Sequence, residues 1–258
     1  MKIIGEAMHI LNQSFVQALE DRDTDAVARM ARDQVKAGAE ALDVNLGQVR
    51  HFGILTPWLV ETVQEAADVP LFLSSHVLKQ QRALEVHKGR AVINAVTADP
   101  DDLRRAMETA GPFEADLVVL LVSSQLTPSD VDGRLFLGIQ VMDIAAEVGF
   151  PPDRLYLDPV IACRTDPTTW TLSAGLPDID TLVTSVQLLG ELAEPGLRTL
   201  TGLSNASVCL PQGKRSAFHC RLLPLLAEAG LDAVIMNCCD KALMARAKEL
   251  DAPEAIAA

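Results

Sequence analysis

Short apolar runs alternate with amphipathic stretches along almost the whole chain. Each of eight runs is rich in β-branched residues or leucine, and each is followed by a loop and then by apolar positions at helical spacing. The runs are nearly all apolar, which is typical of parallel strands that are covered on both faces. The predicted strands are Lys2–Ile4, Ala41–Asn45, Pro70–Leu73, Ala91–Asn94, Leu117–Val122, Leu155–Asp158, Thr199–Leu203 and Ala233–Met236.

Helical spacing is clear between the first two predicted strands. Over Asp23–Lys36, the residues Val27, Ala31 and Val35 share one face, and Gly38 follows where a helix C-terminus is expected. Similar patterns predict helices over Thr56–Ala67, Val77–Val86, Asp99–Thr109, Arg134–Val148, Asp178–Leu192, Ser216–Ala229 and Lys241–Leu250.

Eight strand–helix units in 258 residues match the number and size of a (β/α)8 barrel, an α/β fold. We interpret residues 1–258 as one such domain, because no linker or low-complexity tract divides them. A doubly wound open sheet is the alternative, but no G-x-G-x-x-G follows a strand and no G-x-x-x-x-G-K-[ST] occurs. The longest irregular stretch, Val160 to Pro177, is expected to form a loop over the barrel mouth.

Charge and composition narrow the classes of partner and compartment. The chain has 22 Lys and Arg against 35 Asp and Glu, so we expect no nucleic-acid partner, since duplex binding requires clustered positive charge. No apolar run approaches the roughly 20 residues that span a bilayer, so we expect no membrane partner. Five cysteines and an N-terminus without a signal-peptide pattern indicate reduced thiols and a cytoplasmic location.

Polar residues stand where most of the predicted strands end. In a (β/α)8 barrel the functional residues lie at the C-terminal ends of the strands. A single Asp, Asn or Ser at such a place is common as a turn or capping residue, but together the residues at the strand ends form a candidate site. The strongest candidates are Asp43, Ser74, Asn94, Asp158 and Asn205.

Carboxylate and carboxamide groups at an apolar mouth match the edge of a flat heterocycle. An ionised aspartate accepts two N–H bonds, and an asparagine offers both a donor and an acceptor, so together they fit an aminopyrimidinone ring. The five histidines show neither His-x-x-x-His spacing nor a Cys-x-x-Cys companion, so we expect no metal site.

Several motifs in register resemble those of the pterin-binding methyltransferases. That family includes the methyltetrahydrofolate:corrinoid/iron-sulfur protein methyltransferase and the folate domain of cobalamin-dependent methionine synthase. The resemblance covers nearly the whole chain. The motifs are I-I-G-E at Ile3–Glu6, A-G-A-x-A-L-D-V-N-x-G at Ala37–Gly47, I-N at Ile93–Asn94, L-D-P at Leu157–Pro159, G-L-S-N-x-S at Gly202–Ser207 and G-L-D-A-V-I at Gly230–Ile235.

The resemblance implies a TIM barrel of the dihydropteroate synthase type, usually a homodimer. It implies transfer of a methyl group between N5 of tetrahydrofolate and the cobalt of a corrinoid (cobalamin). No D-x-H-x-x-G signature for cobalamin occurs, so the corrinoid would be carried by a partner protein. By the same resemblance Asp43, Asn94 and Asp158 bind the pterin, while Asn205 binds N5 and is the catalytic residue.

The chain departs from the family pattern at three positions. Ala7 and His9 stand where the family has Arg and Asn in G-E-R-x-N. Ser74 stands where relatives have the aspartate of L-D-S, which contacts the pterin, so we expect altered pterin recognition there. Two alternatives therefore stay open: the same barrel acting on another pterin or methyl donor, and a non-catalytic subunit that binds a pterin or a corrinoid protein.

Overall fold

The computed structural model describes residues 1–47, 53–161, 164–165, 172–192 and 196–251. Within this part of the chain, eight parallel strands close into a barrel. Each of them coincides with one of the predicted runs to within a few residues. The strands are β1 (Lys2–His9), β2 (Ala41–Asn45), β3 (Leu71–Leu73), β4 (Val92–Thr97), β5 (Asp116–Leu120), β6 (Leu155–Asp158), β9 (Arg198–Gly202) and β10 (Ala233–Met236).

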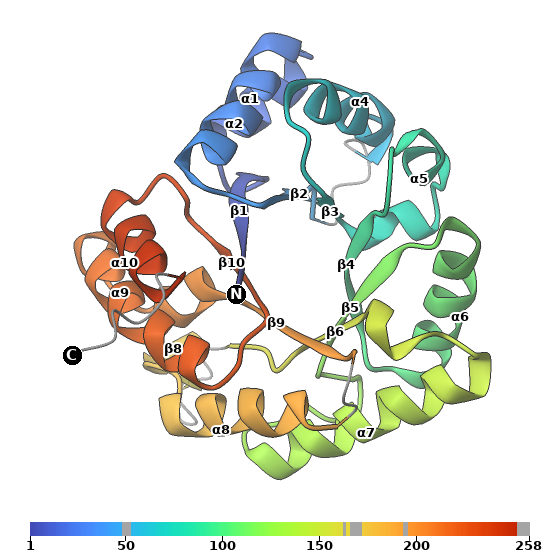
Figure 1. Cartoon of the computed structure of the whole chain (residues 1–258), viewed down its shortest axis with the longest axis vertical. Coiled ribbons are helices and arrows are strands. Elements are labelled where there is room, and N and C mark those ends of the chain that lie inside the picture. The colour runs from blue at the N-terminus through green and yellow to red at the C-terminus, as the bar shows by residue number, and fades with distance from the viewer. Residues whose placement is uncertain (48–52, 162–163, 166–171, 193–195, 252–258) are drawn as a thin grey trace, which may run out of the picture.

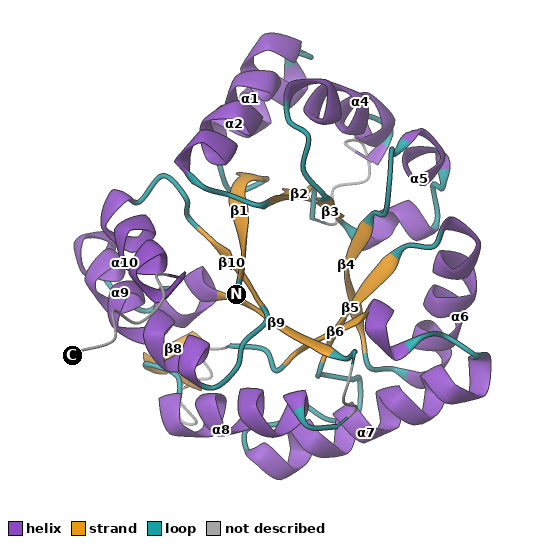
Figure 2. Cartoon of the chain, viewed as in Figure 1, coloured by secondary structure: helices purple, strands orange, loops and turns teal. Residues whose placement is uncertain are grey.

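The barrel has the order β1-β10-β9-β6-β5-β4-β3-β2 and closes between β1 and β2. Strands form an inner ring and helices an outer ring around it (Figures 1 and 2). Each strand is thus covered by the barrel interior on one side and by helices on the other, which explains its apolar sequence. The predicted (β/α)8 barrel is confirmed, and the open-sheet alternative is wrong.

The helices start and stop where short-range signals place them. At α2 (Thr24–Ala37), the Asp23 side chain accepts a hydrogen bond from the N–H of Ala26, and Gly38 ends the helix with a φ of 119°. The remaining α-helices are α1 (Gln13–Glu20), α4 (Thr56–Ala66), α5 (Arg82–Val86), α6 (Pro100–Ala110), α7 (Val131–Val148), α8 (Ile179–Gly190), α9 (Gln212–Glu228) and α10 (Lys241–Asp251). None of the described helices is long and apolar enough to span a membrane.

Three local predictions need correction. Helix α1 was not expected, because only eight residues form it and Phe15 and Leu19 give it a short buried face. The helix predicted over Val77–Val86 is a 3-10 turn, η1 (Ser75–Leu78), followed by α5, since three polar residues lie between them. The loop predicted over Val160 to Pro177, partly outside the described residues, contains a two-stranded antiparallel sheet formed by β7 (Arg164–Thr165) and β8 (Leu172–Gly175).

An apolar layer fills the barrel interior. One side chain from each barrel strand forms it: Ile4, Ala41, Phe72, Val92, Val118, Tyr156, Leu200 and Ala233. Side chains alternate between the two faces of a strand, so the residue two positions further on belongs to the next layer toward the C-terminal ends. That next layer contains Glu6, Asp43, Ser74, Asn94, Leu120, Asp158, Gly202 and Ile235. Five of these eight residues are polar, and this set, here called the polar layer, follows the apolar one.

Candidate functional site

A cavity of about 670 Å³ opens at the C-terminal ends of the barrel strands. Its volume is in the range of small-molecule sites. All members of the polar layer line it except Ser74. The other lining residues come from the C-terminal parts of β1, β2 and β4, from the segments that follow β1, β9 and β10, and from the start of α9: Ala7, His9, Leu11, Asn12, Asn45, Ala95, Ser204, Asn205, Val208, Arg215, Asn237 and Cys239.

Asp43 and Asn94 form a hydrogen-bonded pair at the base of this cavity. Asp43, on β2, is buried, and its Oδ1 accepts a 3.0 Å hydrogen bond from Asn94 Nδ2 on β4. With one N–H of its amide used in this way, Asn94 keeps its carbonyl oxygen and its second N–H for a bound molecule. The pair therefore presents mixed acceptor and donor capacity to the cavity.

Asp158 lies at the end of β6 with one oxygen fixed by the protein. Its Oδ1 accepts from the N–H of Val160 at 2.8 Å and from the Thr201 hydroxyl at 3.4 Å. Arg134, on α7, supports the same turn by donating from Nε to the carbonyl of Pro159 at 2.8 Å. Both of these hydrogen bonds to the carboxylate end on Oδ1, so Oδ2 can accept from a ligand.

Asn205 lies at the rim on η4 (Leu203–Ser207), directly after β9. Its side chain lines the cavity and passes close over Gly202, where an added Cβ would lie 3.0 Å from Asn205 Nδ2. Asn205 thus reaches the same cavity as Asp43, Asn94 and Asp158, from the end of the strand next to that of Asp158.

Two further groups at the cavity come from β1. Glu6 accepts a 2.6 Å hydrogen bond at Oε1 from the Ser204 hydroxyl. His9 accepts at Nδ1 from the N–H of Leu11 at 3.0 Å, so the neutral ring carries its proton on Nε2. Among the lining residues, Arg215 is the one permanent cation, and it donates to the backbone carbonyls of Leu210 and Val208.

Burial dominates the electrostatics of the three carboxyl groups. It raises the pKa of both Asp43 and Asp158 to about 7, although hydrogen bonds from Asn94 and from Val160 oppose the shift. Burial also raises the pKa of Glu6, against the hydrogen bond from Ser204. No group of three or more His, Cys, Asp or Glu in the described residues is arranged to hold a metal ion.

Comparison with known families decides the relationship. Residues 8–237 match the sequence profile of the family described as "Pterin binding enzyme". This chain belongs to that family. The match covers most of the barrel, including Asp43, Asn94, Asp158 and Asn205 at the cavity of this pterin-binding enzyme.

Two curated relatives show how this pterin-binding enzyme relates to proteins of known name. It is 24% identical to methylcorrinoid:tetrahydrofolate methyltransferase from Eubacterium limosum over 244 residues, covering 92% of this chain and 85% of the relative. It is 25% identical to methionine synthase from Mycobacterium leprae over 234 residues, covering 86% of this chain but only 19% of that protein. The chain thus spans about a fifth of the length of methionine synthase.

Solved structures confirm the fold of this pterin-binding enzyme. Dihydropteroate synthase from Stenotrophomonas maltophilia superimposes with a TM-score of 0.70 at 17% identity, covering 100% of this chain and 94% of that one. The Xanthomonas albilineans dihydropteroate synthase in complex with 7,8-dihydropteroate gives 0.70 at 18% identity, covering 99% and 93%. The expected barrel of the dihydropteroate synthase type is present.

The structure brings together all but one of the predicted site residues. Ser74 is the exception: its hydroxyl donates to the carbonyl of Val44 at 3.2 Å and accepts from the N–H of Leu46 at 2.8 Å. Strand β3 ends at Leu73, so Ser74 already belongs to the turn into η1, and its side chain fixes the backbone that follows β2. A direct contact between Ser74 and a ligand therefore stays a prediction without geometric support.

Glu6 and Arg215 line the cavity but were not among the predicted site residues. Glu6 was visible as a polar residue at the end of a strand, and the two-residue alternation from the apolar Ile4 would have placed it in the same layer as Asp43. Arg215 lies on α9, and its place at the rim depends on how α9 packs on η4. No local sequence signal indicates that placement.

Proposed function

We propose that this chain transfers a methyl group between N5 of tetrahydrofolate and the cobalt of a corrinoid carried by a separate protein. The observation that carries the proposal is the meeting of Asp43, Asn94, Asp158 and Asn205 in one cavity above an apolar layer. Support also comes from similarity to methylcorrinoid:tetrahydrofolate methyltransferase over most of both chains.

The polar base of the cavity fits an aminopyrimidinone ring. Ionised Asp158 accepts hydrogen bonds from the pterin 2-amino group and from N3–H. Asn94, held by Asp43, forms a hydrogen bond with a donor or an acceptor on another edge of the ring. The flat faces of the ring then lie among apolar neighbours such as Leu120 and Ile235. The proposal requires N5 to lie within reach of Asn205, which lines the same cavity.

The protein's part in the reaction is donation of a hydrogen bond and positioning. The methyl carbon changes partner in one in-line step, and when tetrahydrofolate is the leaving group its N5 keeps the bonding electron pair and takes up a proton from the solvent. A hydrogen bond from Asn205 to N5 strengthens as that charge develops, which lowers the barrier without any side-chain nucleophile. When bound, the corrinoid supplies the cobalt that takes or gives the methyl.

The corrinoid-binding protein would approach the open end of the barrel. Leu11 and Val208 line the mouth and are largely exposed, so they offer apolar contacts around it. The homodimer implied by the resemblance is also part of the proposal, and the exposed Phe136 and Ile139 of α7 provide an apolar face for it.

A second candidate is action on another pterin or methyl donor. The orientation of Ser74 favours it, since the Ser74 hydroxyl bonds to the backbone of Val44 and Leu46 and offers the cavity no acceptor for a pterin N–H. A non-catalytic pterin- or corrinoid-protein-binding subunit is the third candidate.

A spectroscopic assay separates these candidates. We expect the absorbance of cob(I)alamin to convert to that of methylcobalamin when the protein and methyltetrahydrofolate are added, or the reverse with tetrahydrofolate and methylcobalamin. Saturable binding of methyltetrahydrofolate without conversion would favour the non-catalytic subunit. Absence of binding would favour a different pterin or donor.

Asp158→Asn is expected to weaken methyltetrahydrofolate binding. An amide at this position turns one acceptor into a donor and leaves a pterin N–H facing another N–H, which costs about 1–3 kcal/mol, roughly 5–150-fold in Kd. Isothermal titration calorimetry on the parent and variant measures the change. Equal Kd values for the two proteins would remove Asp158 from the pterin site.

Binding is expected to weaken as the pH falls below 7. Because burial raises the pKa of Asp158 to about 7, the protonated acid increasingly replaces the carboxylate that accepts the pterin protons. One such group raises Kd by about tenfold per pH unit between pH 7 and 5 and leaves it flat above pH 8. Titrations across this range on the parent and on Asp158→Asn test this, since the variant should show a smaller slope; identical slopes would refute the assignment.

The pH dependence of stability in the ligand-free protein has the opposite sign to that of binding. Both Asp43 and Asp158 have a pKa of about 7 in the folded chain, above the ordinary value of 3.8. Between these values the folded state binds more protons than the unfolded state, so these two groups lower the free energy of unfolding as the pH rises from about 4 to 7. The same burial that prepares the carboxylates for a ligand therefore destabilises the empty protein at neutral pH.

A further inference from the structure

The η4 turn that carries Asn205 is tied to β1 by one hydroxyl. Ser204, the residue just before Asn205, donates from Oγ to Glu6 Oε1 at 2.6 Å. The two partners are 198 positions apart in the sequence, and the bond spans the cavity wall between β1 and η4. Glu6 is largely buried beside Asp43, so its carboxyl is a fixed anchor and not a mobile surface group.

A second hydroxyl ties the other end of the same turn to α9. Ser207 donates from Oγ to the carbonyl of Ser204 at 3.2 Å and lies 2.8 Å from His219 Nε2. A hydroxyl has one proton, so Ser207 accepts from His219, which carries its proton on Nε2. Both Ser207 and His219 are buried, so water does not compete for these bonds.

The backbone beneath Asn205 is adapted to its side chain. Gly202 lies directly under the Asn205 amide, and a Cβ there would lie 3.0 Å from Nδ2, closer than nearly all such contacts. The G-L-S-N-x-S motif thus combines a glycine that makes room, two serines that anchor the turn, and the asparagine between the anchors.

We infer that Ser204 and Ser207, anchored by Glu6 and His219, are positioning residues that hold Asn205 in its place at the cavity. This inference rests on the proposed function for the reaction that Asn205 serves. Small displacements of a reacting or donating group, of 1 Å or less, are enough to lower a rate strongly. The effect of either serine should therefore be exerted through Asn205 and be visible in kcat.

A double-mutant cycle tests the inference. Ser204→Ala is expected to lower kcat by about tenfold with KM changed less than twofold, and Ser204→Thr, which keeps the hydroxyl, should restore most of the rate. In an Asn205→Ala background, Ser204→Ala should lower kcat by less than twofold, because nothing remains to be positioned. Equal losses from Ser204→Ala in both backgrounds would overturn the inference.

Thr199→Val is the matched control. Thr199 lies on β9, the strand that leads into η4, and its buried hydroxyl donates to Asp232 Oδ2 at 3.1 Å, at the opposite end of the barrel. Thr199→Val should lower the thermal stability by about as much as Ser204→Ala does and leave kcat unchanged. A loss of kcat in Thr199→Val as large as in Ser204→Ala would mean that the effect is general loosening of β9, and the inference would fail.

An NMR measurement keeps the inference separate from the proposed reaction. The side-chain amide signal of Asn205, assigned by its loss in Asn205→Ala, should shift or broaden in Ser204→Ala and stay in place in Thr199→Val. If the parent protein transfers no methyl group, the proposed reaction is wrong. The NMR spectrum then still tests whether Ser204 positions Asn205. An unchanged Asn205 signal in Ser204→Ala would overturn it.

Discussion

Asn205→Ala is expected to lower kcat for methyl transfer by about 10²–10³-fold while changing the Kd of methyltetrahydrofolate by less than about threefold. The asymmetry follows from the proposed role: the bond from Asn205 to N5 is weak in the bound substrate and strong where charge develops in the transition state. Removing one such donor costs about 2.7–4 kcal/mol of transition-state stabilisation. The pterin edge, held by Asn94 and Asp158, keeps its contacts.

Stopped-flow absorbance of the cobalt and calorimetric titration measure the two constants separately. Asn205→Asp is the matched variant, because it keeps the size of the side chain and removes the N–H donor. It should lose as much rate as the alanine variant. Equal losses in binding and turnover, or a fully active aspartate variant, would show that Asn205 does not donate to N5.

The barrel was predictable because each strand carries its own signal. A strand such as β5 or β6 is apolar on both faces and ends in a turn, so its sequence alone marks its position. The alternation of such runs with amphipathic helices then leaves few arrangements, and a chain of this length favours closure. All eight strands were therefore located, although β1 extends five residues beyond its predicted end, while α1 and α5, with few apolar positions, were missed or merged with a neighbour.

The sequence predicted which strand ends carry the candidate site, but it did not predict the direction in which each side chain points. Asp43, Asn94, Asp158 and Asn205 were selected because polar residues at the C-terminal ends of barrel strands converge. Ser74 satisfied the same rule, but its hydroxyl bonds to the backbone after β2, which only the packed structure shows.

Contacts between segments that are far apart in the sequence were the other feature that could not be predicted. The pairing of Glu6 with Ser204 depends on the closure of the barrel, which brings β1 to the side of β9 across β10. Neither residue carries a local signal of that partner. The serines of G-L-S-N-x-S could be read as a motif, but their role needs the positions of β1 and α9.

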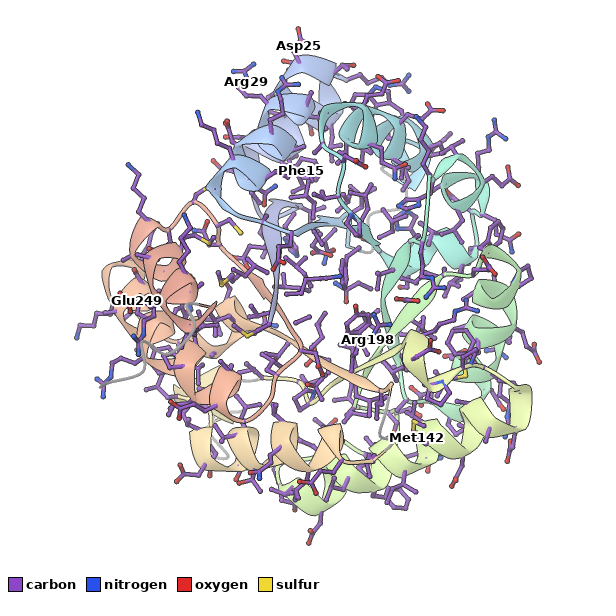
Figure 3. The ribbon with its side chains drawn as sticks, viewed as in Figure 1. Phe15, Asp25, Arg29, Met142, Arg198 and Glu249 are labelled. Carbon is purple, nitrogen blue, oxygen red and sulfur yellow. The ribbon has the colours of Figure 1, made fainter. Side chains whose placement is uncertain are left out.

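An ion pair between the partly exposed Arg198 and the buried carboxylate of Asp116, at the N-terminal end of the barrel, gives the largest expected effect on stability. Arg198, at the start of β9, lies on the inner ring of strands, whereas Asp25 and Arg29 project from the outer helices (Figure 3). It donates to Asp116 Oδ2 at 2.8 Å and to the Tyr156 hydroxyl at 2.7 Å, and its guanidinium lies 3.9 Å from the centre of the Tyr156 ring.

Arg198→Leu is expected to lower the free energy of unfolding by about 3–5 kcal/mol, because it removes the 2.8 Å partner of the buried Asp116 carboxylate and leaves it the longer 3.6 Å contact to Arg90. Chemical denaturation measures the loss. In the double variant Arg198→Leu/Asp116→Leu most of the stability should return, since no buried charge is left unpaired. Methyl transfer by the folded fraction should be unchanged in both variants, because this end of the barrel serves stability and the opposite end carries the site. A double variant no more stable than Arg198→Leu would show that packing on Tyr156, and not the ion pair, makes Arg198 important.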